Sequence, residues 1–79
     1  MTPAELAVLT ILARSSEPVG WYAIERRLSN VRLAERPHLP RLLDDLVARD
    51  LVGSVGGDDA RYAITPRGLA ALETSRAPS

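Results

Sequence analysis

The chain has 79 residues and a formal net charge of zero at pH 7, with ten arginines, no lysine and ten acidic residues. It has no cysteine, which excludes disulfides and thiolate metal sites. No apolar run approaches the roughly 20 residues that a bilayer requires, and the N-terminus has no signal-peptide pattern. We therefore expect a cytoplasmic protein with no membrane partner, built as a single domain over residues 1–75 with a frayed tail at 76–79.

Catalytic chemistry is not indicated by the residue types present. The chain has one histidine and no glycine loop with phosphate-binding spacing. Paired acids could act as acid and base, but that mechanism needs a pocket, which we do not expect in so short a chain. The sequence therefore predicts no enzyme, no catalytic residue, no metal and no cofactor.

The first helix is predicted at residues 2–14. Thr2 fits the N-cap, Pro3 fits the first helical position and Glu5 follows three residues after the cap, which completes a capping box. The apolar residues of this segment cover more than one stripe, so we expect the helix to be packed on several sides. Residues 15–20, SSEPVG, are expected to form a turn.

A second, short helix is predicted at residues 21–29, and residues 30–37 then form a connector. Asn30 suits a left-handed C-cap, a conformation that asparagine tolerates. Trp21, the only tryptophan, opens this helix next to Tyr22. We interpret Trp21 as a packing aromatic; the alternative is an exposed anchor at an interface, where tryptophan and tyrosine are enriched.

The third helix is predicted at residues 38–50. Its apolar side chains recur at spacings of three and four, which places them on the inward face of an amphipathic helix. They are Leu39, Leu42, Leu43, Leu46 and Val47. Pro40 can be accommodated only in the first turn, where its missing N–H would have had no partner, so the regular helix begins at 38–40.

Two short strand-like runs follow, LVGSV at 51–55 and RYAIT at 61–65. The residues between them, GGDDA, supply glycines and aspartates that suit a hairpin turn. Thr65 can then cap a fourth helix at 66–74, with Pro66 as its first residue. Three helices, a hairpin and a helix in this order predict a mainly α fold with a small β-hairpin: a winged helix-turn-helix with a three-helix core, a two-stranded wing and a C-terminal helix.

Three stretches carry a resemblance to a known family. LAVLTILARSSEPVGWYAIERRL has a first helix, a Pro–Gly–Tyr turn and a second helix in the family's order. LPRLLDDLVARDLVGS is similar to the family's third helix, with Asp50 where a glycine is usual, and RYAITPRGLAAL is similar to its closing pattern. Together these stretches, over about residues 5–73, resemble PadR-like transcriptional regulators of the PadR and MarR type.

The resemblance implies a small bacterial transcriptional regulator that binds double-stranded DNA, as a homodimer. The third helix would enter the major groove and the hairpin would lie along the adjacent minor groove or backbone. By position, the base-facing residues would be His38, Pro40, Arg41 and Asp44, and the backbone-contacting residues would be Tyr22 and Arg61.

The arginines around the third helix add a second indication of nucleic-acid binding. Arg36 and Arg41 flank His38, and we expect these three to make the leading contacts with DNA. With Arg26, Arg27 and Arg32 they would form a basic stripe on one side of the helix-turn-helix. The alternative is that these arginines pair with Glu25, Glu35 and Asp45 on a mixed surface.

Other features favour a different function. Asp44-Asp45 and Asp58-Asp59 stand where PadR-like proteins commonly have basic residues, and the chain lacks the net positive charge on which non-specific DNA affinity depends. The chain ends soon after the fourth helix, so we expect any dimer to use other surfaces, such as the first helix. The alternative function is a winged-helix interaction module or adaptor that binds a protein partner through the third helix.

Overall fold

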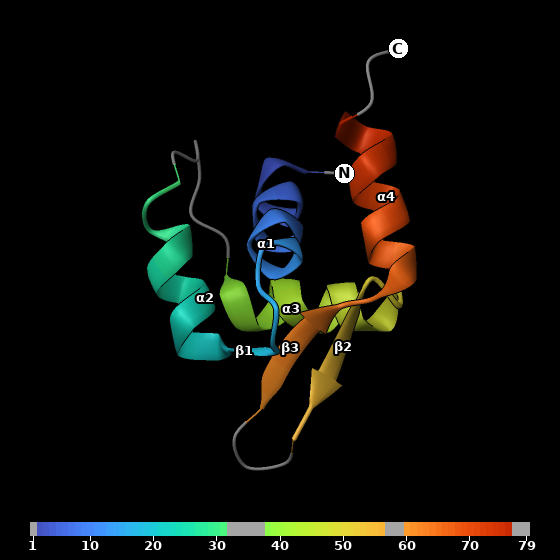
Figure 1. The fold of residues 1–79 in the computed structure, drawn as a ribbon. Helices are drawn as coiled ribbons and strands as arrows, with labels where there is room; N and C mark the ends of the chain where they lie inside the picture. The colour runs from blue at the N-terminus through green and yellow to red at the C-terminus, as the bar shows by residue number, and fades with distance from the viewer. Residues whose placement is uncertain (1, 32–37, 57–59, 77–79) are drawn as a thin grey trace.

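The predicted order of elements is confirmed, with one strand added (Figure 1). The computed structural model describes residues 2–31, 38–56 and 60–76. The described helices are α1 (Pro3–Ala13), α2 (Trp21–Leu28), α3 (Leu39–Ala48) and α4 (Pro66–Arg76). The described strands are β1 (Val19–Gly20), β2 (Val52–Val55) and β3 (Arg61–Ile64). α4 runs two residues beyond its predicted end, and residues 77–79 of the predicted tail lie outside the described residues.

The start of α1 has the predicted capping box. The Thr2 hydroxyl accepts a hydrogen bond from the Glu5 amide at 3.2 Å, and the Glu5 carboxylate accepts one from the Thr2 amide at 2.9 Å. Each side chain thus satisfies a backbone N–H that the helix itself cannot pair. The local sequence therefore determines where α1 begins.

The predicted two-stranded wing is present as β2 and β3, and β1 adds a third strand, which corrects the prediction of a plain turn at residues 15–20. β1 pairs antiparallel with β3, and β3 pairs with β2, in the order β1-β3-β2. The register places Val19 opposite Tyr62 and Gly20 opposite Arg61. A strand of two residues is too short to show alternation, so its pairing depends on where the hairpin lies and not on its own sequence. The turn residues Asp58 and Asp59 lie outside the described residues.

The end of α3 is built around Asp50, whose φ of 59° lies in the left-handed region. The Leu51 amide donates to the Leu46 carbonyl and the Asp50 amide donates to the Val47 carbonyl, both at 3.0 Å. This is a Schellman motif, and glycine is its usual left-handed residue. α3 therefore ends at Ala48, two residues before its predicted end.

The predicted left-handed cap at Asn30 is wrong. Asp50 is the only non-glycine residue of positive φ in the described part of the chain, and α2 ends on Ser29 in right-handed geometry. The Ser29 hydroxyl donates to the Arg26 carbonyl at 2.6 Å, which satisfies one of the last carbonyls of α2. Asn30 is consequently not needed as a left-handed cap.

Thr65 joins the end of β3 to two helices. Its hydroxyl donates to the Asp50 carbonyl at 2.6 Å and accepts from the Gly68 amide at 3.0 Å. The second bond is the predicted N-cap of α4, with Pro66 as the first helical residue. The first bond is long-range, and it ties the start of α4 to the left-handed turn that ends α3.

The core lies around α1, which is placed between α2 and α4 (Figure 1). The buried apolar residues of the core come from all four described helices, from strands β1 and β2, and from the position directly before β2. They are Val8, Leu9, Leu12, Val19, Ile24, Leu28, Leu39, Leu43, Leu46, Leu51, Val52 and Leu72. Trp21 packs against this cluster as predicted, and its indole Nε1 has no hydrogen-bond partner among the described residues. None of the described helices combines the length and apolar character needed to cross a bilayer.

Candidate nucleic-acid interface

The outer face of α3 is open to solvent. Leu39, Leu43 and Leu46 turn inward and are buried, while the predicted base-facing residues on the other side are exposed: His38, Pro40, Arg41 and Asp44. His38 is the N-cap residue and its side chain makes no capping hydrogen bond. Pro40 lies in the first turn of α3, where its missing backbone N–H leaves no hydrogen bond unmade. The structure therefore leaves all four side chains available to a partner.

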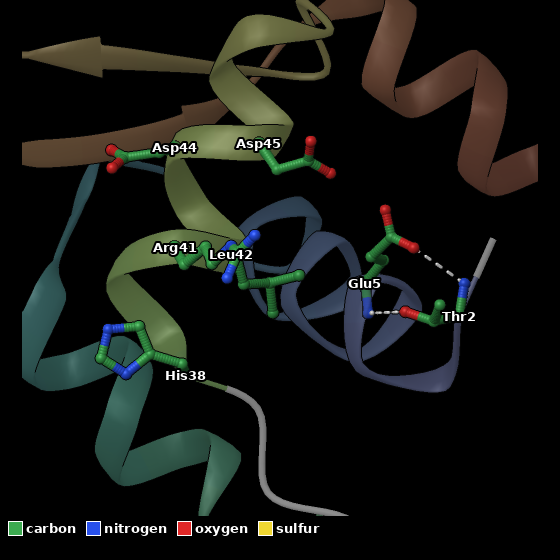
Figure 2. Close-up of a pocket in the computed structure, with 7 residues that line it drawn as sticks. All are labelled: Thr2, Glu5, His38, Arg41, Leu42, Asp44 and Asp45. Atoms are coloured by element: carbon green, nitrogen blue, oxygen red, sulfur yellow. Dashed lines mark hydrogen bonds between the residues drawn. The ribbon is translucent and has the colours of Figure 1, made fainter.

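The two adjacent aspartates of α3 point in different directions (Figure 2). Asp44 points away from α1, whereas Asp45 points toward the side where Glu5 of α1 lies. The Asp45 carboxylate forms an ion pair at 3.2 Å with the guanidinium group of Arg49, which lies one helical turn later. The acidic pair seen in the sequence is thus divided between an outward carboxylate and one that is paired within the protein.

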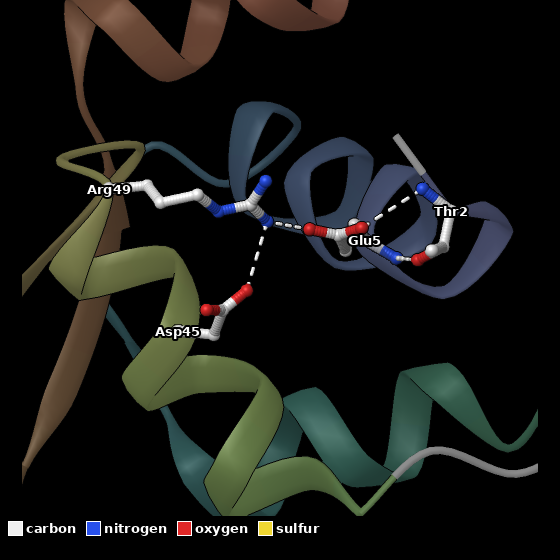
Figure 3. Close-up of polar contacts among 4 residues, drawn as sticks. All are labelled: Thr2, Glu5, Asp45 and Arg49. Carbon is white, nitrogen blue, oxygen red and sulfur yellow. Dashed lines mark hydrogen bonds and ion pairs between the residues drawn. The ribbon is translucent and has the colours of Figure 1, made fainter.

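Arg49 connects α3 to the start of α1 (Figure 3). Its guanidinium group forms ion pairs with both Glu5 and Asp45. Glu5 is buried, with 7% of its surface exposed, and its other carboxylate oxygen accepts the Thr2 amide. A buried carboxylate is stable only if it is paired and hydrogen-bonded, so this network holds the C-terminal turn of α3 against the N-terminal turn of α1.

A cleft of about 580 Å³ lies between the start of α1 and α3 (Figure 2). It is lined by Thr2, Glu5, His38, Arg41, Leu42, Asp44 and Asp45. Carboxylates outnumber cations among these residues, and the Glu5 and Asp45 carboxylates already have a partner in Arg49. Arg41 makes no ion pair with an acid in the described ranges, so its five N–H donors are available.

The predicted backbone contacts lie at a second cleft, of about 620 Å³. Tyr22, in the first turn of α2, is 69% exposed, and Arg61 opens β3 beside Gly20. Arg14, at the end of α1, and Arg27 line the same cleft. Sequence reasoning did not place Arg14 in any site and did not connect Arg27 with Arg61, because no local spacing relates these positions.

The basic stripe predicted between residues 26 and 41 is only partly described. Arg32, Arg36 and Glu35 lie outside the described residues. Arg27 donates to the Ser15 hydroxyl at 2.8 Å, and neither it nor Arg26 forms an ion pair with an acid that the structure describes. Arg27 and Arg41 line different clefts, so these two cations serve different parts of the surface. Within the described ranges, no group of three or more His, Cys, Asp or Glu could hold a metal ion.

Comparison with known proteins supports the fold. No protein-family model and no curated protein matches this chain. The structure of RosR from H. salinarum superposes with a TM-score of 0.79 and 29% identity, over 95% of this chain and 70% of that one. A possible HxlR family transcriptional factor from Thermoplasma volcanium GSS1 superposes with a TM-score of 0.73 and 20% identity, over 95% of this chain and 66% of that one. Helix order, sheet topology and these superpositions agree that the chain has the winged-helix fold found in transcription factors.

Proposed function

We propose that this chain is a DNA-binding transcriptional regulator that reads duplex DNA with α3 and its wing. The observation that carries the proposal is the open outer face of α3, on which Arg41 has no acidic partner among the described residues, within a fold shared with RosR and an HxlR family factor. In this fold the third helix enters the major groove. The superposition with the HxlR family factor supports the fold alone, and the 29% identity to RosR supports the proposed role as a transcriptional regulator.

The chemistry of the outer face suits base reading. Arg41 can donate two hydrogen bonds to the O6 and N7 atoms of guanine, the commonest specific contact in the major groove. Asp44, three residues later, can accept from the N4 amino group of cytosine. The Asp45 side chain is 60% exposed, but Arg49 offsets its charge, so the acidic pair repels the phosphates less than the sequence indicates.

A binding-site selection from a random duplex pool, followed by fluorescence anisotropy, tests this proposal. Replacement of Arg41 by glutamine should weaken binding to the selected site by about 1–3 kcal/mol and relax the preference at one base pair. Arg67→Gln, which removes the same charge from the exposed first turn of α4, is the matched control and should leave that preference intact. Failure of the unmodified protein to bind any duplex at low salt would rule the function out.

Two finer points belong to the same proposal. We take the regulator to be PadR-like, because the Pro18–Gly20–Tyr22 turn and the Thr65–Gly68–Leu72 pattern match that family in order and spacing. We also propose that it acts as a cytoplasmic homodimer, which would present two third helices about 34 Å apart, one turn of DNA. Sedimentation equilibrium and the spacing of half-sites in the selected duplexes test the dimer.

The acidic character of the α3 cleft supports a second candidate, an interaction module that binds a basic segment of a protein partner. Glu5, Asp44 and Asp45 all line that cleft, and the Asp44 carboxylate, which has no ion-pair partner among the described residues, would accept hydrogen bonds from a cationic peptide. A purified partner should then lose its affinity on Asp44→Arg, whereas the same substitution should strengthen binding to duplexes of unselected sequence if α3 faces DNA, because it replaces a carboxylate near the phosphates with a cation. The direction of that one change distinguishes the two functions.

A further inference from the structure

The second cleft gathers cations from three elements that are distant in sequence. Arg14 comes from the end of α1, Arg27 from the last turn of α2 and Arg61 from the first residue of β3. All three are exposed, and none forms an ion pair with an acid in the part of the chain that the structure describes. From this convergence we infer that the cleft is a phosphate-binding site, filled by a backbone phosphate of the bound duplex, with Arg14 and Arg27 as contacts beyond those expected at Tyr22 and Arg61.

The charges around the cleft favour an anion. Among its titratable lining residues are three guanidinium groups, the Tyr22 phenol and one carboxylate, that of Glu17. An arginine that neutralises a phosphate of the duplex releases the cations condensed around it into bulk solvent, and this release favours the contact. Arginine is also the cation whose planar donors match two phosphate oxygens at once.

The geometry of the cleft supports the same assignment. The start of α2 lines the cleft through Gly20, Tyr22 and Ala23. Gly20 is the N-cap of this helix and has no side chain, so the N–H groups of the first turn have no side-chain acceptor. These groups carry the positive end of the helix dipole and add to the field of the arginines. Arg27 is held by its hydrogen bond to Ser15, whose own hydroxyl donates to the Ile11 carbonyl at 3.0 Å. Less side-chain entropy is therefore lost when Arg27 meets a phosphate.

The occupant follows from the cleft's position, and this step rests on the proposed function. Arg61 opens the returning strand of the wing and Tyr22 opens the helix that precedes α3, so both lie where a winged helix approaches the DNA backbone. Arg14 and Arg27 extend that contact toward α1. Backbone contacts fix the register of a protein on its duplex and carry no sequence information themselves.

Salt dependence of duplex binding tests the inference. Arg14→Gln and Arg27→Gln should each reduce the magnitude of the slope of log K against log salt by about 0.9, the value for one lost phosphate contact. Discrimination between selected and scrambled duplexes should stay unchanged, and Arg67→Gln should keep the slope of the unmodified protein. The Arg14 side chain makes no hydrogen bond or ion pair with the residues that the structure describes, so Arg14→Gln tests the cleft even if loss of the Ser15 hydrogen bond makes Arg27→Gln unstable. Slopes that match the Arg67→Gln control for both variants would overturn the inference.

A titration with inorganic pyrophosphate separates this inference from the proposed function. The amide resonances of Gly20 and Tyr22 should shift on addition of pyrophosphate, and the shifts should be lost in the Arg14→Gln/Arg27→Gln double variant. If the unmodified protein binds no duplex, the proposed function fails and the duplex is excluded as occupant. Pyrophosphate then tests the phosphate chemistry by itself, and resonances that do not move would overturn it.

Discussion

Replacement of Gly68 by alanine is the sharpest test of how this fold is held together. Gly68 lies in the first turn of α4 and does not have positive φ, so alanine fits its backbone conformation. On helix propensity alone the change should stabilise the protein by up to about 1 kcal/mol. The surroundings predict the opposite. An added Cβ would overlap the Leu51 carbonyl oxygen, and it would lie 2.8 Å from Ile64 Cγ1 and 3.0 Å from the Leu51 carbonyl carbon.

These neighbours cannot move away without a cost. The Leu51 carbonyl oxygen accepts the Thr65 amide at 3.2 Å, and the adjacent Asp50 carbonyl accepts the Thr65 hydroxyl at 2.6 Å. Overpacking costs about 1–3 kcal/mol, and a strained or broken hydrogen bond adds about 1 kcal/mol. After the gain in propensity is subtracted, Gly68→Ala should lower the free energy of unfolding by about 1–3 kcal/mol. A domain of this length has only about 4–12 kcal/mol in total.

Urea unfolding followed by circular dichroism and by the fluorescence of Trp21 measures this loss. Gly20→Ala and Gly53→Ala are matched controls, because a Cβ at Gly20 meets nothing within 4 Å and one at Gly53 meets only ordinary contacts at 3.9 Å. Both should stay within about 1 kcal/mol of the unmodified protein. A Gly68→Ala variant as stable as the unmodified protein, or more so, would refute the close approach of α4 to the start of β2.

Substitutions at three further positions, Asp50, Thr65 and Arg49, test the contacts that hold α3 to the rest of the fold. Asp50→Gly should raise the free energy of unfolding by about 0.5 kcal/mol, and Asp50→Ala should lower it by about 1 kcal/mol, because the backbone at this position is left-handed. Thermal unfolding measures both changes, and equal stabilities of the two variants would contradict the Schellman motif at the end of α3. Thr65→Val should lose both hydroxyl bonds and about 1–2 kcal/mol, whereas Thr65→Ser should retain most of that stability in urea unfolding. Arg49→Met should cost about 1–3 kcal/mol by leaving Glu5 buried without its cation. A double-mutant cycle with Glu5→Gln should recover part of that loss, and strict additivity would show that the pair is not coupled.

Much of the fold could be predicted because its signals are local. The capping box at Thr2 and Glu5, the cap at Thr65 and the position of Pro40 each depend on residues within four positions of one another. The inward face of α3 was predicted for the same reason, although Val47 at its edge is exposed. Asp50 was recognised as standing in a glycine position, and its φ shows why glycine is usual there.

The candidate site was predicted less completely. The side chains of α3 that should face DNA are exposed as expected, and their roles remain predictions. What the sequence did not reveal is that Tyr22 and Arg61 share a cleft with Arg14 and Arg27. Nor did it show that Asp44 and Asp45, adjacent in the chain, differ in their partners.

The amino-acid sequence by itself determined the four helices, the N-terminal caps at Thr2 and Thr65 and the two strands of the hairpin, because hydrogen bonds and apolar periodicity within one or two turns are enough to specify them. Only the tertiary structure decided the pairing of β1 with β3, the bridge from Arg49 to Glu5 and the meeting of three arginines at one cleft. Each of these joins residues more than ten positions apart, and no local pattern records which distant segments the packed core brings together.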